Sequence, residues 1–316
     1  MKKEDLRIVF MGTPDFAVES LRKLVENGYN IVGVITAPDK PAGRGYKLQQ
    51  SAVKEYAVSQ NLNVLQPVNL KDEQFIEELR SLEADIQVVV AFRMLPEVVW
   101  DMPPKGTFNL HGSLLPQYRG AAPINWAVIN GEKETGVTTF FLKHEIDTGE
   151  IIFREKVVIE PNDNAGVIHD KLMVIGADLV QKTIDAVIDG SADATPQEEL
   201  FENAAELRPA PKIFRETCEI DWTKPAKEIH NHIRGLAPYP AAWTLFEVDG
   251  KMVNFKIYES EIISESHDLA KGTIVTDNKT TLRIAVQDGF IDILELQMSG
   301  KRKMKTRELL NGFSFD

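Results

Sequence analysis

Cysteine is nearly absent from this sequence of 316 residues, which contains Cys218 alone. A single cysteine excludes an intramolecular disulfide and any zinc site built on several thiolates. Long apolar runs are also absent, because each is interrupted before the ~18 residues that a membrane-spanning helix needs. The charged start, residues 1–5, lacks the apolar segment of a signal peptide. We therefore expect a cytoplasmic protein that does not contact a membrane.

Several short motifs of known chemistry are missing. The turn after the first apolar run holds one glycine, Gly12, and not the G-x-G-x-x-G pattern of dinucleotide-binding proteins. The sequence has no Walker A motif, no G-x-S-x-G nucleophile turn and no H-E-x-x-H zinc motif. These absences disfavour dinucleotide-binding enzymes, P-loop enzymes, serine hydrolases and metalloenzymes, and we expect no metal.

Acidic residues outnumber basic ones, and the formal net charge is −12. This excess argues against a protein that coats nucleic acid without selectivity. Residues 36–54 and residues 301–308 depart from it, because both segments are net basic. For either segment alone, a solvated surface loop is the commoner explanation, and a binding site for a polyanion is the alternative. Their basic residues include Lys40, Arg44, Lys47, Lys301, Arg302 and Lys303.

Alternating strand and helix patterns predict an α/β domain over residues 1–190. Residues 6–11 form a short apolar strand, and Thr13 is the expected N-cap of a helix with Pro14 at its first position. A strand over 31–36 follows, so the sheet should be parallel. Further strands are expected over 86–92, 107–111, 137–142 and 151–159, and helices over 72–82, 123–129 and 165–188.

The remainder of the chain has a different composition. Residues 191–211 are rich in Ala, Glu and Pro and show no steady periodicity, which is typical of a linker. Residues 212–316 carry about five short strand patterns separated by turn signals such as Asp249-Gly250. We therefore expect a second, small domain of the barrel or sandwich class.

The expected strand over 107–111 carries two polar side chains at its carboxyl end. Asn109 and His111 are two residues apart, so they share one face of the strand. Asp147, in the connection between two later strands, can reach the same edge of the sheet. An amide, an imidazole and a carboxylate suit the addition of an amine to a carbonyl carbon, since they stabilise an oxyanion and move a proton.

Each of these features also has a common structural explanation. An Asn-x-His pair is usually a strand edge or a turn, and Asp147-Thr148-Gly149 alone is typical of a turn. Ser113 lies near His111, but it opens a Ser-Leu-Leu-Pro turn without the signature of a nucleophile. The chemistry therefore depends on whether Asn109, His111 and Asp147 meet.

The order of these residues resembles that of the folate-dependent formyltransferases. The resemblance rests on Asn109-Leu110-His111, Ser113-Leu114-Leu115-Pro116, Tyr118-Arg119-Gly120 and Asp147, with FMGTPDFA near the start and TAPDKPAGRGYKL at residues 36–48. It covers nearly the whole chain, second domain included. It implies a Rossmann-like formyltransferase domain followed by an OB-like β-barrel that binds tRNA.

The resemblance implies an activity and site residues. A formyl group would pass from the co-substrate 10-formyltetrahydrofolate to the amino group of methionine on initiator tRNA. Asn109, His111 and Asp147 match the catalytic residues of the family, and Ser113, Leu114, Leu115 and Pro116 match its folate-binding loop. The segment around Arg44 matches a loop that enters the tRNA acceptor end. For tRNA contacts we expect Arg44, Lys40, Lys47, Lys301, Arg302 and Lys303.

The chain departs from the family at Phe92-Arg93, where many members have Tyr-Gly. The role of Arg119 stays open between folate, tRNA and the fold. A monomer is expected. The alternatives are transfer to another amine, such as a nucleotide sugar or glycinamide ribonucleotide, a hydrolase releasing formate, and a non-catalytic RNA-binding module. The second domain and the glycine-containing basic segment favour tRNA.

Overall fold

The computed structural model describes residues 2–42 and 47–315. The chain divides into two compact units. The first unit comprises Met1–Gly120, Gly136–Val157 and His169–Pro209, and the second comprises Ala121–Thr135, Val158–Ile168 and Ala210–Asp316. The second unit thus takes up two short segments from within the range 1–190, where the sequence predicts a single domain.

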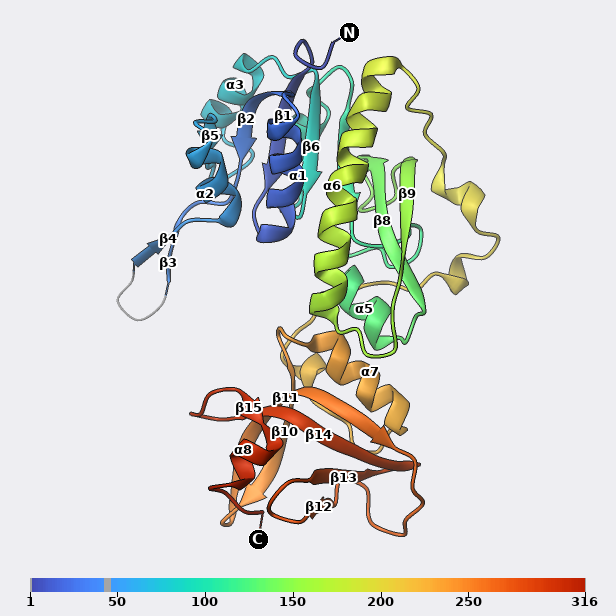
Figure 1. Cartoon of the computed structure of the whole chain (residues 1–316). Helices are drawn as coiled ribbons and strands as arrows, with labels where there is room; N and C mark the ends of the chain where they lie inside the picture. Colours follow the sequence, from blue (N-terminus) through green and yellow to red (C-terminus); the bar gives the residue numbers. More distant parts are fainter. Residues whose placement is uncertain (1, 43–46, 316) are drawn as a thin grey trace. The chain divides into compact units, whose positions relative to one another are not determined.

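The first unit is built on a seven-stranded sheet with the order β5-β2-β1-β6-β7-β8-β9 (Figure 1). Strands β5, β2, β1, β6 and β7 are parallel, and β8 is antiparallel to β7. The strands are β1 (Arg7–Gly12), β2 (Asn30–Ile35), β5 (Val64–Leu65), β6 (Ile86–Val90), β7 (Thr107–His111), β8 (Glu134–Phe141) and β9 (Ile151–Val158). The predicted α/β class with a largely parallel sheet is confirmed.

Helices connect the parallel strands, as βαβ crossovers require. These are α1 (Asp15–Glu26), α2 (Ala52–Ser59), α3 (Glu73–Ser81) and α4 (Glu97–Trp100), and a further helix, α6 (Ala165–Asp189), follows β9. The prediction that Thr13 caps α1 is wrong, because Pro14 occupies the N-cap position and no side chain caps the helix. Leu21 and Leu24 of α1 are buried, and Val18 and Val25 are half-buried.

The segment predicted to be a linker, residues 191–211, packs against the first unit for most of its length. Thr195 pairs with Ile151 through two backbone hydrogen bonds of 2.8 Å. Two short 3-10 helices follow, η1 (Gln197–Leu200) and η2 (Ala204–Glu206). Turns this short leave no periodic sequence pattern, which is why the composition of the segment suggested a free connection.

The second unit has an antiparallel sheet with the order β10-β11-β14-β13-β12, and β15 pairs with β14. Its core is formed by buried side chains of this sheet and of α7, including Phe255, Ile233 and Leu296. The elements are α5 (Pro123–Ile129), η3 (Glu216–Cys218), α7 (Ala226–Leu236), β10 (Ala242–Val248), β11 (Lys251–Ile263), β12 (Ile274–Thr276), β13 (Leu282–Val286), β14 (Gly289–Met298), β15 (Met304–Lys305) and α8 (Thr306–Leu310). A small β domain after the α/β domain is confirmed.

Within residues 2–42 and 47–315, no helix is both long and apolar enough to cross a membrane. In the same part of the chain, no group of three or more His, Cys, Asp or Glu side chains is arranged to hold a metal ion.

Candidate active site

The candidate site begins at the carboxyl end of β7, in the first unit. Asn109 and His111 alternate along this strand with the buried Phe108 and Leu110, so they lie on one face. β7 pairs with parallel β6 on one side and with β8 on the other. Asn109 is half-buried, and no hydrogen bond of its side chain is seen among the described residues. Its amide is therefore free to donate to a ligand.

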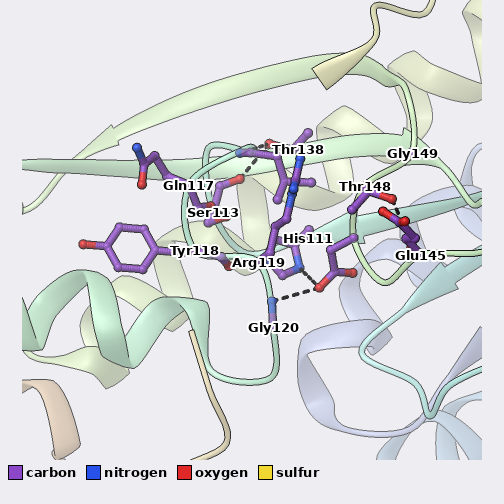
Figure 2. A network of polar contacts seen from close by, with 12 residues as sticks. His111, Ser113, Gln117, Tyr118, Arg119, Gly120, Thr138, Glu145, Thr148 and Gly149 are labelled. Carbon is purple, nitrogen blue, oxygen red and sulfur yellow. Dashed lines mark hydrogen bonds and ion pairs between the residues drawn. The ribbon is translucent and has the colours of Figure 1, made fainter. Parts of the chain in front are cut away.

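The imidazole of His111 is held by a backbone carbonyl. Its Nε2 lies 2.8 Å from the carbonyl oxygen of Tyr118, and the side chain is almost fully buried. Figure 2 shows the ring of Tyr118 directed away from His111, so Tyr118 contributes its carbonyl alone. A carbonyl only accepts, so Nε2 must carry the proton. In the neutral ring, Nδ1 therefore carries a lone pair, and it is the ring nitrogen that can accept a proton.

The carboxylate of Asp147 faces that nitrogen. Its Oδ2 lies 4.0 Å from Nδ1 of His111 and accepts a 2.9 Å hydrogen bond from the backbone N–H of Gly120 (Figure 2). Asp147 itself has a positive φ of 55°, which is uncommon for a residue other than glycine. The structure therefore brings His111 and Asp147 together from chain positions 36 residues apart (111 and 147).

Ser113 and its neighbours lie inside the unit. Ser113 and Leu115 are fully buried, Pro116 is buried, and Leu114 is half-buried. The Ser113 hydroxyl donates to the carbonyl of Gln117 at 2.6 Å, a hydrogen bond that holds it within its own turn. Thr138 donates to the Ser113 carbonyl and accepts from the Leu115 N–H. The side chains of Ser113, Leu115 and Pro116 therefore support the fold. Only Leu114 and the backbone groups of this loop are placed to contact a bound ligand.

Arg119 and Gln197 complete the polar surroundings of Asp147. Nε and Nη2 of Arg119 donate to Oε1 of Gln197 at 3.0 and 2.7 Å. Nε2 of Gln197 donates to the carbonyls of Asp147 and Gly149 at 3.0 and 2.8 Å. No sequence pattern indicates Gln197, because it lies in the segment predicted to be a linker. The Tyr-Arg-Gly sequence includes Arg119 but leaves its role open.

The hydrogen bond from Nε2 predicts the tautomer of His111. In two-bond ¹H–¹⁵N spectra of protein labelled at its histidines, neutral His111 should show Nε2 protonated and Nδ1 unprotonated. A His111→Gln variant identifies the resonance. The Nδ1–H tautomer at neutral pH would contradict the donor assignment to the Tyr118 carbonyl.

Two of the residues predicted to touch tRNA near the start of the chain, Lys40 and Lys47, lie in a pair of short strands. Strands β3 (Lys40–Ala42) and β4 (Lys47–Gln49) form a separate two-stranded sheet in the first unit (Figure 1). Lys40 is exposed on β3, and Lys47 begins β4. Arg44 lies outside the described residues, so its predicted role stays a prediction.

The basic residues near the other end of the chain are exposed, and two of them are paired. Arg302 lies 3.2 Å from the carboxylate of Glu308, and Lys303 lies 2.9 Å from that of Glu295. Lys301 lies over the ring of Phe313 at 5.7 Å. These partners neutralise part of the positive charge, so the segment offers less free charge to a phosphate backbone than its sequence suggests.

Two family profiles match this chain over most of its length. The profile described as formyl transferase matches residues 6–184, and that of the formyl transferase C-terminal domain matches residues 212–314. Among solved structures, a formyltransferase from Helicobacter canadensis in complex with folinic acid and dTDP-3-aminofucose superposes with a TM-score of 0.68. The two share 23% identity, with 95% of this chain and 100% of that chain covered. A likeness at this level of identity shows the fold.

Curated relatives are much more similar in sequence. A methionyl-tRNA formyltransferase of Bacteroides fragilis is 63% identical over 314 residues, covering 99% of this chain and 97% of the relative. One from Flavobacterium johnsoniae is 53% identical over 312 residues, covering 99% and 98%. The matched residues span both units. The chain belongs to the formyl transferase family and, within it, to the methionyl-tRNA formyltransferases.

Proposed function

We propose that this chain transfers the formyl group of 10-formyltetrahydrofolate to the free amino group of methionine on initiator methionyl-tRNA, which supplies N-formylmethionyl-tRNA for translation initiation. The observation that carries the proposal is the meeting of His111 and Asp147 at 4.0 Å, next to the free amide of Asn109. The family assignment supports the same reaction, and the folate complexes among its structural relatives support a folate-type donor.

The reaction needs an oxyanion site and a proton acceptor. The methionine nitrogen attacks the formyl carbon, a C–N bond forms, and the carbonyl oxygen becomes an oxyanion that accepts from the Asn109 amide. The amine proton passes to Nδ1 of His111, and the adjacent Asp147 carboxylate stabilises the imidazolium. When the tetrahedral intermediate breaks down, N10 of the donor leaves and takes up this proton, giving tetrahydrofolate.

A hollow in the first unit reaches the loop that carries Asp147, and we assign part of the formyl donor to it. It has a volume of about 1220 Å³ and includes His144, which precedes Asp147 by three residues in one loop. Apolar Leu95 and Trp100 line it together with the cations Lys71, Arg80 and Arg93 and the carboxylates of Glu97 and Asp101. The apolar side chains suit the aromatic ring of the p-aminobenzoyl-glutamate part of a folate, and we assign its carboxylates to Lys71, because Arg80 is paired with Glu77. We infer that this part of the donor lies there, with the pterin closer to backbone groups of the Ser113–Pro116 loop.

The side chain of Arg93 is already committed to the protein. Its Nη1 donates to the carbonyl of Val68 at 2.8 Å, and its Nη2 donates to that of Pro67. Partial burial lowers the pKa of Arg93, although the group stays charged at neutral pH. Arg93 therefore fixes the backbone of residues 67–68 at the edge of the hollow. Many family members have glycine at this position.

The acceptor contacts are proposed from charge. Lys40 and Lys47 belong to β3 and β4, Lys301–Lys303 are exposed in the second unit, and Arg44 lies outside the described residues. We assign them contacts with tRNA phosphates, which would make binding sensitive to salt. A tRNA acceptor places the enzyme in the cytoplasm. One chain supplies Asn109, His111 and Asp147, so a monomer suffices.

The test is a formyl-transfer assay with purified protein, 10-formyltetrahydrofolate and charged initiator tRNA. We expect N-formylmethionyl-tRNA to form with charged tRNA, and no product with uncharged tRNA or with amino sugars. Turnover of an amino sugar or of glycinamide ribonucleotide would favour another formyltransferase. Formate release without a formylated amine would favour a hydrolase, and tRNA binding without turnover would favour a non-catalytic module.

The oxyanion role of Asn109 predicts a rate effect. Replacing Asn109 with alanine should lower kcat about 100- to 1,000-fold, because one oxyanion donor is lost, and should change KM for methionyl-tRNA little. Asn254→Ala is a matched control, since Asn254 is a half-buried strand asparagine in the second unit. A change in KM with kcat preserved would instead place Asn109 in ground-state binding.

A further inference from the structure

Three consecutive residues hold both reacting side chains of the proposed site. The carbonyl of Tyr118 accepts from Nε2 of His111, and the backbone N–H of Gly120 donates to the carboxylate of Asp147. Between them, Arg119 sends its guanidinium to Gln197 through two hydrogen bonds. Tyr118 and Gly120 both have positive φ, of 60° and 126°, so the backbone turns sharply to present these groups.

Gln197 is a fully buried polar residue whose hydrogen-bonding capacity is used on both sides. Its relative exposure is 0%, and burial of an amide is costly unless each polar atom has a partner. Oε1 accepts two N–H groups of Arg119, and the two hydrogens of Nε2 go to the carbonyls of Asp147 and Gly149. Few side chains other than an amide offer an acceptor and two donors in this arrangement.

These contacts fix the backbone from which the Asp147 carboxylate projects. A residue with φ of 55° costs free energy and keeps that conformation only where its surroundings hold it. Gln197 holds the carbonyl of Asp147 itself and that of Gly149, two residues later. Arg119 in turn fixes the orientation of the Gln197 amide, because its two N–H groups distinguish Oε1 from Nε2.

We propose that Arg119 and Gln197 are positioning residues that set the Asp147 carboxylate against Nδ1 of His111 for proton transfer. The inference rests on the proposed role of Asp147 in the reaction. It assigns Arg119 to the support of catalysis, and neither to folate nor to tRNA. It also makes the segment over residues 191–211 part of the active site, because Gln197 in this segment contacts the backbone of Asp147.

The experiment measures kcat and KM for methionyl-tRNA in Gln197→Met, with the melting temperature as a check on folding. We expect kcat to fall about 30- to 100-fold, because displacements near 1 Å have effects of this size, while KM changes less than about threefold. Gln87→Met is the matched control, since Gln87 is also 0% exposed but lies within β6. It should keep the wild-type kcat even where its melting temperature falls.

Two further variants rank the contacts. Gln197→Glu keeps the acceptor for Arg119 but turns an oxygen toward two carbonyls, so it should lower kcat at least as much as Gln197→Met. Arg119→Met removes the outer pair of hydrogen bonds, and Arg119→Lys should recover part of the loss. Arg119→Met also serves as the test if Gln197→Met does not fold.

A double variant distinguishes a positioning role of Gln197 from a general loss of structure. In Asp147→Asn, where the carboxylate is gone, adding Gln197→Met should lower the residual rate less than twofold. An equal fold loss in both backgrounds would overturn the inference, and so would a wild-type kcat for both Gln197→Met and Arg119→Met. If Asp147→Asn alone turned over normally, the proposed role of Asp147 would fail together with the inference. If only the Gln197 and Arg119 variants were normal, the proposed function would stand.

Discussion

Replacing Asp147 with asparagine is expected to lower kcat for formyl transfer about 1,000-fold with little change in folding. The asparagine carbonyl can still accept the N–H of Gly120, so the loop keeps its 2.9 Å contact. The oxygen that accepts from Gly120, Oδ2, is also the atom 4.0 Å from Nδ1 of His111, so the variant would present a neutral amide oxygen to that nitrogen. Nδ1 could still accept the amine proton, but no carboxylate would stabilise the imidazolium that forms. Acid–base groups contribute about 10²- to 10⁴-fold to rates.

The measurement is steady-state kinetics with charged initiator tRNA, together with a thermal melt. Asp85→Asn is a matched control, because the Asp85 carboxylate accepts a 2.8 Å hydrogen bond from the backbone N–H of Arg7, in the same unit. We expect Asp85→Asn to keep kcat within about twofold, because Asp85 makes no contact with the residues of the site. A wild-type kcat for Asp147→Asn would show that the Asp147 carboxylate takes no part in the reaction. His111 would then act as the proton acceptor without a carboxylate beside it.

The elements of the fold could be predicted because their patterns are local. The strand over 107–111 and the helix over 123–129 were predicted at the bounds that the structure shows. Apolar alternation and helical spacing depend on neighbouring residues, and these are visible in one sequence. The shared face of Asn109 and His111 followed from the same rule, since residues two apart in a strand point to one side.

The surroundings of the site could not be predicted because their contacts are distant in sequence. Gln197 lies 50 residues from Asp147 and 78 from Arg119, in a segment without periodicity. The burial of Ser113 and Leu115 depends on Thr138 and on the cluster around Phe140, neither of which the loop sequence reveals. The carbonyl of Tyr118 carries no sequence signal at all, because every residue has a carbonyl.

Gly149 should be the most sensitive position for stability near the site. A Cβ added there would lie 1.6 Å from the carbonyl oxygen of Phe141 and 3.2 Å from Cδ2 of Phe140. Relief requires movement of backbone, because the closest atom is a main-chain carbonyl. The connection between β8 and β9 is closed by a 3.0 Å hydrogen bond from the N–H of Phe141 to the carbonyl of Glu150, so it resists that movement.

We therefore expect Gly149→Ala to destabilise the first unit by about 3–5 kcal/mol, at the upper end of overpacking effects. The melting temperature should fall by about 10 °C, measured by circular dichroism. Gly312→Ala is the control, because a Cβ there meets nothing within 4 Å. Formyl transfer should fall with Gly149→Ala even below its melting temperature. The carbonyl of Gly149 accepts from Gln197, so displacing this residue displaces the support of Asp147. A stable Gly149→Ala with normal kcat would show that the connection can shift without moving the carboxylate.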